Sequence, residues 1–222
     1  MSATSLWKRT GESDMSARVY ATWITFLTAY GIAISAMTAY LVVGRNLSLG
    51  FTFAVFLVAA LGVYITWENE SPVVSFVGYT LIVIAFGFIT GPTVARYTSA
   101  SVVRILFLSG TMVLGLGMLG ALIPQSLEGW WTWLLGGLLI LLAGNVVLPL
   151  LSLIGIPVGS GLDFLDWIGV ILFSAIVIFD INSAMRIPYT MKNAIDSAAE
   201  IYLDFVIIVI RLLAALGNSD DD

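Results

Sequence analysis

Residues 130–153 read WWTWLLGGLLILLAGNVVLPLLSL and contain no charged side chain. A helix that crosses a bilayer needs about 20 consecutive, mostly apolar residues, so this stretch is long enough. Its tryptophans Trp130, Trp131 and Trp133 gather at one end, which is where tryptophan concentrates at a membrane–water interface. The stretch therefore predicts a transmembrane helix.

The composition extends this prediction to the whole chain. Of 222 residues, 59% are hydrophobic and 10% are charged, and the mean hydropathy is +1.02. A soluble domain carries about 25% charged residues. Because so few charges cannot cover an outer surface, that surface must face lipid. We expect an all-α integral membrane protein whose main partner is the bilayer.

Six further apolar segments bring the expected number of membrane-spanning helices to seven. They cover residues 19–43, 49–67, 73–94, 102–123, 164–184 and 201–216. We expect a polar tail over residues 1–18, a single transmembrane domain over residues 19–217, and an acidic tail over residues 218–222.

The basic residues give the orientation, because Lys and Arg concentrate in cytoplasmic loops. A cytoplasmic N-terminus places five of them inside and three outside or near that interface. The five are Lys8, Arg9, Arg18, Arg186 and Lys192, and the three are Arg45, Arg96 and Arg104. We therefore predict a cytoplasmic N-terminus.

The chain contains no cysteine and no histidine. It therefore has no disulfides, thiol nucleophiles, imidazole metal ligands or Ser-His and Cys-His catalysis. We expect no resident cofactor and no enzymatic activity. The net charge is −5 and no basic cluster is present, so nucleic acid is not an expected partner.

Two of the aspartates within the apolar segments are candidate functional residues. Asp180 lies within IVIFDIN at residues 176–182, and Asp204 lies within IYLDFVI at residues 201–207. A charge in hydrocarbon costs at least about 2.5–3.5 kcal/mol, so such residues mark functional sites. On consecutive antiparallel spans the two carboxyl groups can lie at similar depth. If they meet, repulsion and desolvation disfavour double ionisation, and the pair titrates as one unit.

This arrangement would be a proton switch. The alternative is that Asp180 and Asp204 separately cap helix ends or face a water-filled vestibule.

A second acidic pattern leads into the last span. Asp196, Glu200 and Asp204 recur at intervals of four residues and share one helix face if the helix starts early. Such a stripe can line a cation path, since Ca²⁺ prefers carboxylate and carbonyl oxygens. The alternative for Asp196 and Glu200 is a solvated helix start. Arg211 is expected to extend its side chain to the membrane interface.

Glycines recur in the third and fourth spans. Small residues let helix backbones approach closely in lipid, so we expect close helix packing at these positions. They are Gly87, Gly91, Gly110, Gly115, Gly117 and Gly120.

Three segments resemble the Bax inhibitor-1 family, also called the transmembrane Bax inhibitor motif family, especially its prokaryotic members. FDIN at residues 179–182 is similar to the aspartate segment of the family's sixth helix, and IYLDF at residues 201–205 to its last helix. The 24-residue separation of the two aspartates also fits. The third segment is similar to the family's glycine-proline signature and contains Tyr79-Thr80, Gly87, Gly91-Pro92 and Tyr97.

The resemblance implies seven transmembrane helices, with the last helix central and enclosed by the other six, in a prokaryotic cell membrane. It also implies a pH-sensitive Ca²⁺ leak in which Asp180 and Asp204 act as the pH sensor and as transient Ca²⁺ ligands. Prokaryotic relatives can carry basic residues after the second span that lock the aspartates. This chain has Glu68, Asn69 and Glu70 there, so the resemblance does not extend to that latch.

Three other functions compete with a channel. A proton-coupled secondary transporter would show saturable, substrate-dependent flux. An intramembrane aspartyl protease of the presenilin type would need Gly-x-Gly-Asp, whereas residues 159–163 read GSGLD, one residue longer, and Asp163 would have to lie near Asp180 or Asp204. A non-transporting adaptor would bind other membrane proteins.

Overall fold

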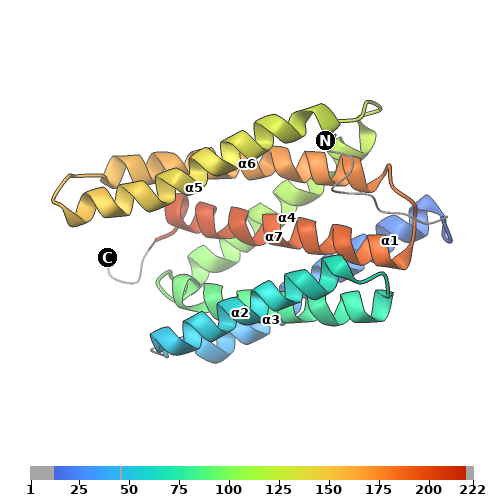
Figure 1. The fold of residues 1–222 in the computed structure, drawn as a ribbon. Coiled ribbons are helices and arrows are strands. Elements are labelled where there is room, and N and C mark those ends of the chain that lie inside the picture. Colours follow the sequence, from blue (N-terminus) through green and yellow to red (C-terminus); the bar gives the residue numbers. More distant parts are fainter. Residues whose placement is uncertain (1–12, 46, 219–222) are drawn as a thin grey trace. The chain divides into compact units, whose positions relative to one another are not determined.

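The structure is a computed structural model that describes residues 13–45 and 47–218 (Figure 1). These residues form seven α-helices and one short 3₁₀ helix, with no strand among them. The elements are α1 (Ala17–Val42), α2 (Leu49–Glu68), α3 (Pro72–Val94), α4 (Ser99–Leu122), η2 (Glu128–Trp130), α5 (Trp131–Leu153), α6 (Gly159–Ala184) and α7 (Met191–Leu216). The expected all-α class is confirmed.

Of the helical segments within residues 13–45 and 47–218, six are long and apolar enough to cross a membrane. They are Ala17–Val42, Leu49–Glu68, Pro72–Val94, Ser99–Leu122, Glu128–Leu153 and Gly161–Ala184. The chain is therefore a multi-pass membrane protein. Helix α7 is not among the six, since it carries five charged side chains.

Helix α7 begins at Met191. The predicted start at residue 201 was therefore wrong by ten residues. Thr190 explains the start at Met191: its Oγ1 accepts a hydrogen bond from the backbone N–H of Asn193 at 3.1 Å. This bond satisfies one of the free N–H groups in the first helical turn. The Asn193 side chain also donates to the Pro188 carbonyl at 2.7 Å.

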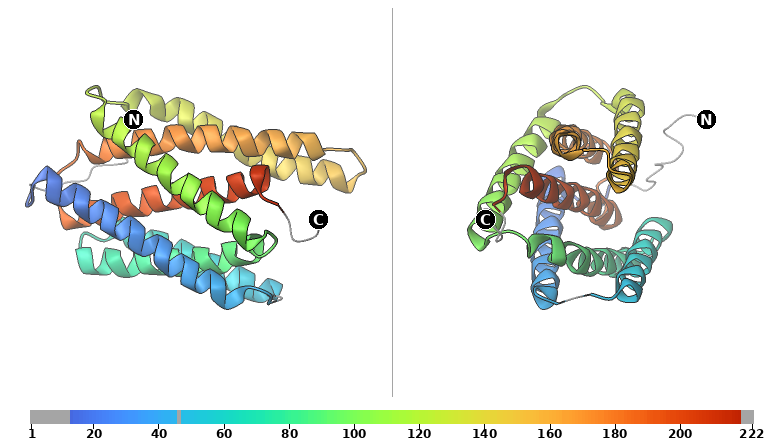
Figure 2. Two further views of the ribbon diagram at one scale, coloured as in Figure 1. Left: turned by 180° about the vertical axis from the view of Figure 1, so that it is seen from behind. Right: turned by 90° about the vertical axis from the view of Figure 1, so that its left-hand side faces the viewer.

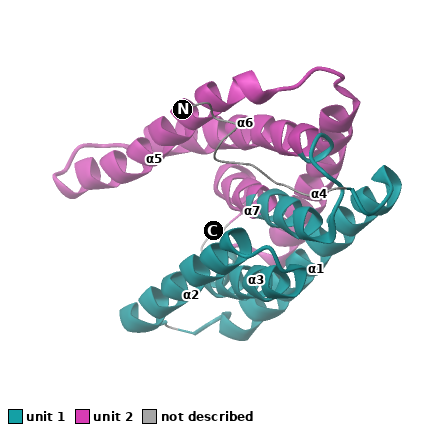
Figure 3. Ribbon diagram, turned by 45° about the vertical axis from the view of Figure 1, so that its right-hand side comes forward, with its two compact units in different colours: residues 1–96, 184–203 teal, residues 97–183, 204–222 magenta. Residues whose placement is uncertain are grey.

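The chain divides into two compact units (Figure 3). Unit 1 contains residues 1–96 and 184–203, and unit 2 contains residues 97–183 and 204–222. Helix α7 therefore contributes its first half to unit 1 and its second half to unit 2. Much of the predicted N-terminal tail, including Lys8 and Arg9, lies outside the described residues, as does most of the acidic tail. The division into two tails and a transmembrane domain over residues 19–217 stays a prediction.

In unit 1, α3 packs against both α1 and α2. Two of the glycines predicted to allow close helix packing lie where α3 crosses α1. A Cβ atom at Gly87 would lie 2.6 Å from the Ser35 carbonyl oxygen, and one at Gly91 would lie 2.9 Å from the Ala39 carbonyl oxygen. The small-xxx-small prediction is confirmed for this pair, because any larger residue would push the α1 backbone away.

In unit 2, α5 and α6 run side by side as an antiparallel hairpin (Figure 2). Helix α4 approaches α6 at Gly120, where a Cβ atom would lie 2.5 Å from the Ile178 carbonyl oxygen. At Gly117 a Cβ would only make an ordinary contact with Ile181, and at Gly110 and Gly115 it would meet no described atom within 4 Å. The packing prediction is therefore right for Gly120 and wrong for Gly110 and Gly115.

Candidate functional site

Asp180 lies in α6, four residues before the helix ends at Ala184, and is half-buried. Its neighbours are held by other parts of unit 2. The backbone of Ile178 packs on Gly120, and the ring of Phe179 stacks on Trp131 with centroids 6.0 Å apart. The helix therefore presents Asp180 from a well-anchored segment.

Asn182 provides the strongest of these anchors and is only 2% exposed. Its side-chain amide donates to the carbonyl oxygens of Gly120 and Ile123 at 3.1 and 3.0 Å. Its carbonyl oxygen accepts the N–H of Leu127 at 3.1 Å. Asn182 thus satisfies the Gly120 carbonyl in the last turn of α4 and the Ile123 carbonyl just after the helix, where the helix itself offers no partner. This role was not predicted from the sequence, although an amide in an apolar helix signals a required hydrogen-bond network.

Asp204 lies thirteen residues into α7 and is 5% exposed. It belongs to unit 2, as does Asp180. The structure therefore places both predicted sensor residues on helices of the same unit. That they share one proton, and that they bind Ca²⁺ transiently, stay predictions.

The early start of α7 places Asp196, Glu200 and Asp204 at the expected spacing within one continuous helix. Asp196 is 4% exposed, and Glu200 is half-buried. The alternative of a solvated helix start is therefore wrong for Asp196. Instead, the Lys192 ammonium contacts Asp196 Oδ1 at 2.7 Å and Oδ2 at 2.5 Å.

A set of buried tyrosines holds the first half of α7 in unit 1. The hydroxyl of Tyr202 bonds to Ser35 Oγ, and Ser35 Oγ donates to the Val83 carbonyl at 2.7 Å. Since Ser35 has only one proton to give, Tyr202 is the donor in its bond. Tyr79 lies edge-to-face against Tyr202 and donates to the Leu27 carbonyl at 2.9 Å. The hydrogen bond of Tyr202 links α7 to α1, and its ring contact with Tyr79 links α7 to α3.

Arg211 makes an ion pair with α6, and the extension of its side chain to the membrane interface stays a prediction. Its Nη1 donates to Asp166 Oδ1 of α6 at 2.6 Å, with both side chains largely buried. Gly169 makes room for it, because a Cβ atom there would lie 3.0 Å from Arg211 Nε. This ion pair was not predicted from the sequence.

The two catalytic aspartates of an aspartyl protease must lie close together, and Asp163 and Asp180 do not. They lie on one continuous helix, α6, 17 residues apart. At 1.5 Å per residue, they are separated by roughly 25 Å along the axis. These two carboxylates therefore cannot act on one peptide bond.

Within residues 13–45 and 47–218, no group of three acidic side chains is arranged to hold a metal ion. That single carboxylates line a cation path stays a prediction. Those predicted for such a path are Asp180, Asp196, Glu200 and Asp204.

The family model described as "Inhibitor of apoptosis-promoting Bax1" matches residues 16–221, nearly the full length of the chain. No curated protein sequence matches the chain.

Proposed function

The chain belongs to the Bax inhibitor family of membrane proteins, and from this premise we propose that it is a pH-sensitive Ca²⁺ leak channel, not an enzyme, gated by Asp180 and Asp204. The observation that carries the proposal is the burial of Asp204, which is 5% exposed in the apolar part of α7. A carboxylate placed there is costly and is expected to serve ion or proton movement.

In the proposed arrangement, α7 crosses the membrane enclosed by the other six helices, and the N-terminus is cytoplasmic. The burial of every residue from 193 to 199 supports an enclosed α7. Five charges make α7 a poor match to lipid, whereas surrounding protein can supply hydrogen bonds and counter-charges. Enclosure thus explains how so polar a helix resides in a membrane protein.

The proposed gate works through a shared proton. Two carboxylates at close range do not both ionise readily, so Asp180 and Asp204 hold one proton between them and a hydrogen bond joins α6 to α7. A change of pH adds or removes that proton and so strengthens or weakens the hydrogen bond between α6 and α7. The ionised oxygens also offer a passing Ca²⁺ the ligands it prefers.

The test is Ca²⁺ release from liposomes that contain the purified full-length protein, measured across a pH series with a trapped indicator dye. We expect a pH-dependent leak that Asp180→Asn and Asp204→Asn each flatten. The matched control is Asp163→Asn, since Asp163 is exposed on the same helix as Asp180. This control should leave the pH profile unchanged.

The same assay separates the competing functions. An unaltered pH profile in both Asp180→Asn and Asp204→Asn would remove the gate. Flux that saturates with one particular solute would favour a proton-coupled transporter. Peptide cleavage that Asp180→Asn or Asp204→Asn abolishes would favour a protease instead.

A further inference from the structure

The C-terminal end of α2 carries backbone carbonyls that no helical N–H can satisfy, because the helix ends at Glu68. Two of them are satisfied from nearby side chains. Asn69 Nδ2 donates to the Ile65 carbonyl at 3.0 Å. The Thr66 carbonyl accepts a hydrogen bond from Ser75 Oγ at 3.2 Å.

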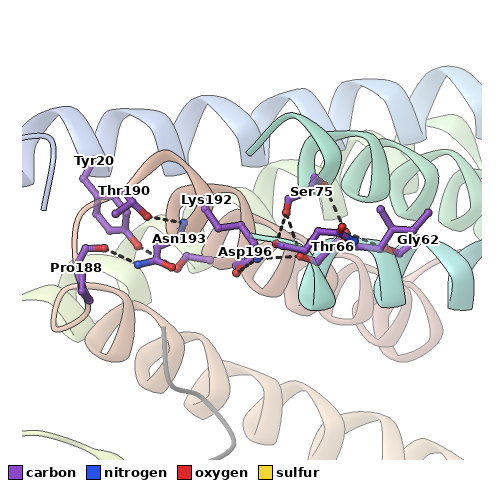
Figure 4. Close-up of polar contacts among 12 residues, drawn as sticks. Tyr20, Gly62, Thr66, Ser75, Pro188, Thr190, Lys192, Asn193 and Asp196 are labelled. Atoms are coloured by element: carbon purple, nitrogen blue, oxygen red, sulfur yellow. Dashed lines mark hydrogen bonds and ion pairs between the residues drawn. The ribbon is translucent and has the colours of Figure 1, made fainter. Parts of the chain in front are cut away.

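A third group reaches this helix end from α7. The Lys192 ammonium donates to the Thr66 carbonyl at 2.9 Å while it binds both carboxylate oxygens of Asp196, at 2.7 and 2.5 Å (Figure 4). The side chains of Lys192 and Asp196 are only 16% and 6% exposed. Three oxygens from two helices thus surround one positive charge.

Neighbouring hydrogen bonds hold the Thr66 carbonyl and the Asp196 carboxylate in place. Thr66 is fully buried, and its own hydroxyl donates to the Gly62 carbonyl at 2.8 Å. Asp196 lies in the second turn of α7, whose start is fixed by the Thr190 cap. The negative end of the α2 dipole also points toward this position and favours a cation there.

We propose that Asp196 and the Thr66 carbonyl form a cation site, and that the Lys192 ammonium is its tethered occupant, excluding inorganic cations. A carboxylate and a backbone carbonyl are the oxygen ligands that hard divalent cations prefer. Without the ammonium, the same oxygens accept Ca²⁺ or a similar ion. This proposed site deepens the proposed Ca²⁺ leak. Its flux test rests on that proposed function, whereas its binding test does not.

The binding test uses detergent-solubilised full-length protein and Tb³⁺, a Ca²⁺ substitute whose luminescence is excited through nearby tryptophan. Trp67 directly follows Thr66 in the chain. We expect Lys192→Met to bind Tb³⁺ with an affinity at least about tenfold higher than wild type, because it lacks the tethered competitor. Added Ca²⁺ should displace the Tb³⁺.

Two further variants make the result specific. Lys192→Arg keeps the positive charge and should bind Tb³⁺ as weakly as wild type. Adding Asp196→Asn to Lys192→Met removes the carboxylate and should abolish the gain. A folded Lys192→Met protein that binds no more Tb³⁺ than wild type would overturn the proposal, and so would an unreduced gain in the double variant.

Loss of folding in Lys192→Met is also decisive. A ligand that binds only the folded state stabilises it, so Ca²⁺ should restore the folded protein, as seen by size-exclusion chromatography and circular dichroism. A protein that stays unfolded in Ca²⁺ shows that Lys192 is only a structural clamp and refutes the proposed site.

The flux measurement keeps this inference distinct from the proposed function. If wild type leaks Ca²⁺, Lys192→Met should leak faster, and an unchanged leak would refute the exclusion of cations by Lys192. If no variant leaks, the channel proposal fails, and Tb³⁺ binding alone decides whether the site exists.

Discussion

Replacing Gly78 by alanine should loosen the α2–α3 crossing. A Cβ atom at Gly78 would lie 2.7 Å from the Thr66 backbone nitrogen and 2.8 Å from the Gly62 carbonyl oxygen. An ordinary contact is about 3.5 Å, so the two backbones must separate by roughly 0.7–0.8 Å. Thr66 Oγ1 would lie closer still, at 2.5 Å, but the other two obstacles are backbone atoms, which no side-chain rotation can move.

The expected free energies follow from this geometry. Forced overpacking costs about 1–3 kcal/mol, and the upper end applies because backbone must move. Alanine regains about 0.5–1 kcal/mol over glycine in a helix, so Gly78→Ala should lower the free energy of unfolding by about 2 kcal/mol. The matched control is Gly115→Ala in α4, where the added Cβ meets no described atom within 4 Å.

The control makes the same chemical change without the clash, so it should raise the free energy of unfolding by about 0.5–1 kcal/mol. Titration of SDS into mixed micelles, followed by circular dichroism, measures both variants against wild type. Equal shifts for Gly78→Ala and Gly115→Ala would refute the reasoning, because the close approach would then contribute nothing.

Two further predictions concern unit 2. Asn182→Ala removes three hydrogen bonds and should lower the free energy of unfolding by about 3 kcal/mol at roughly 1 kcal/mol per bond. Asn145→Ala, which removes one bond within α5, should lower it by no more than about 1 kcal/mol; similar losses in the same SDS titration would contradict the capping role of Asn182. For the ion pair, a double-mutant cycle with Arg211→Met and Asp166→Asn should give a coupling energy between about 1 kcal/mol, as for exposed pairs, and about 3 kcal/mol, as for buried ones. Additive effects of these two substitutions would show that the pair contributes no stability.

The sequence predicted the six apolar helices closely because hydropathy over about 20 residues reports contact with lipid. It misplaced the start of α7 because the same measure treats the polar residues 191–200 as a loop. Local signals for the true start were present. Thr190 is a good helix cap, and Lys192 and Asp196 are one turn apart with opposite charges.

The candidate site was only partly predictable for a different reason. A carboxylate in an apolar segment is visible in one dimension, so Asp180 and Asp204 could be singled out from sequence alone. The partners depend on tertiary packing. Arg211 meets Asp166 across 45 residues, and the oxygen that Lys192 binds on α2 belongs to the backbone, which no residue type identifies.

These partners account for three of the five charged side chains of α7. Near its start, Lys192 faces Asp196, and near its end, Arg211 faces Asp166. Each ion pair cancels the charge at one end of the helix and lowers the cost of placing that end away from water. Asp204 lies between the two pairs, as does Glu200, so on the proposed mechanism a gained or lost proton on Asp204 changes the charge in the middle of the helix. Converting Lys192 to a neutral residue removes one positive charge from the first of these ends, and on the proposed site an inorganic cation is expected to take its place.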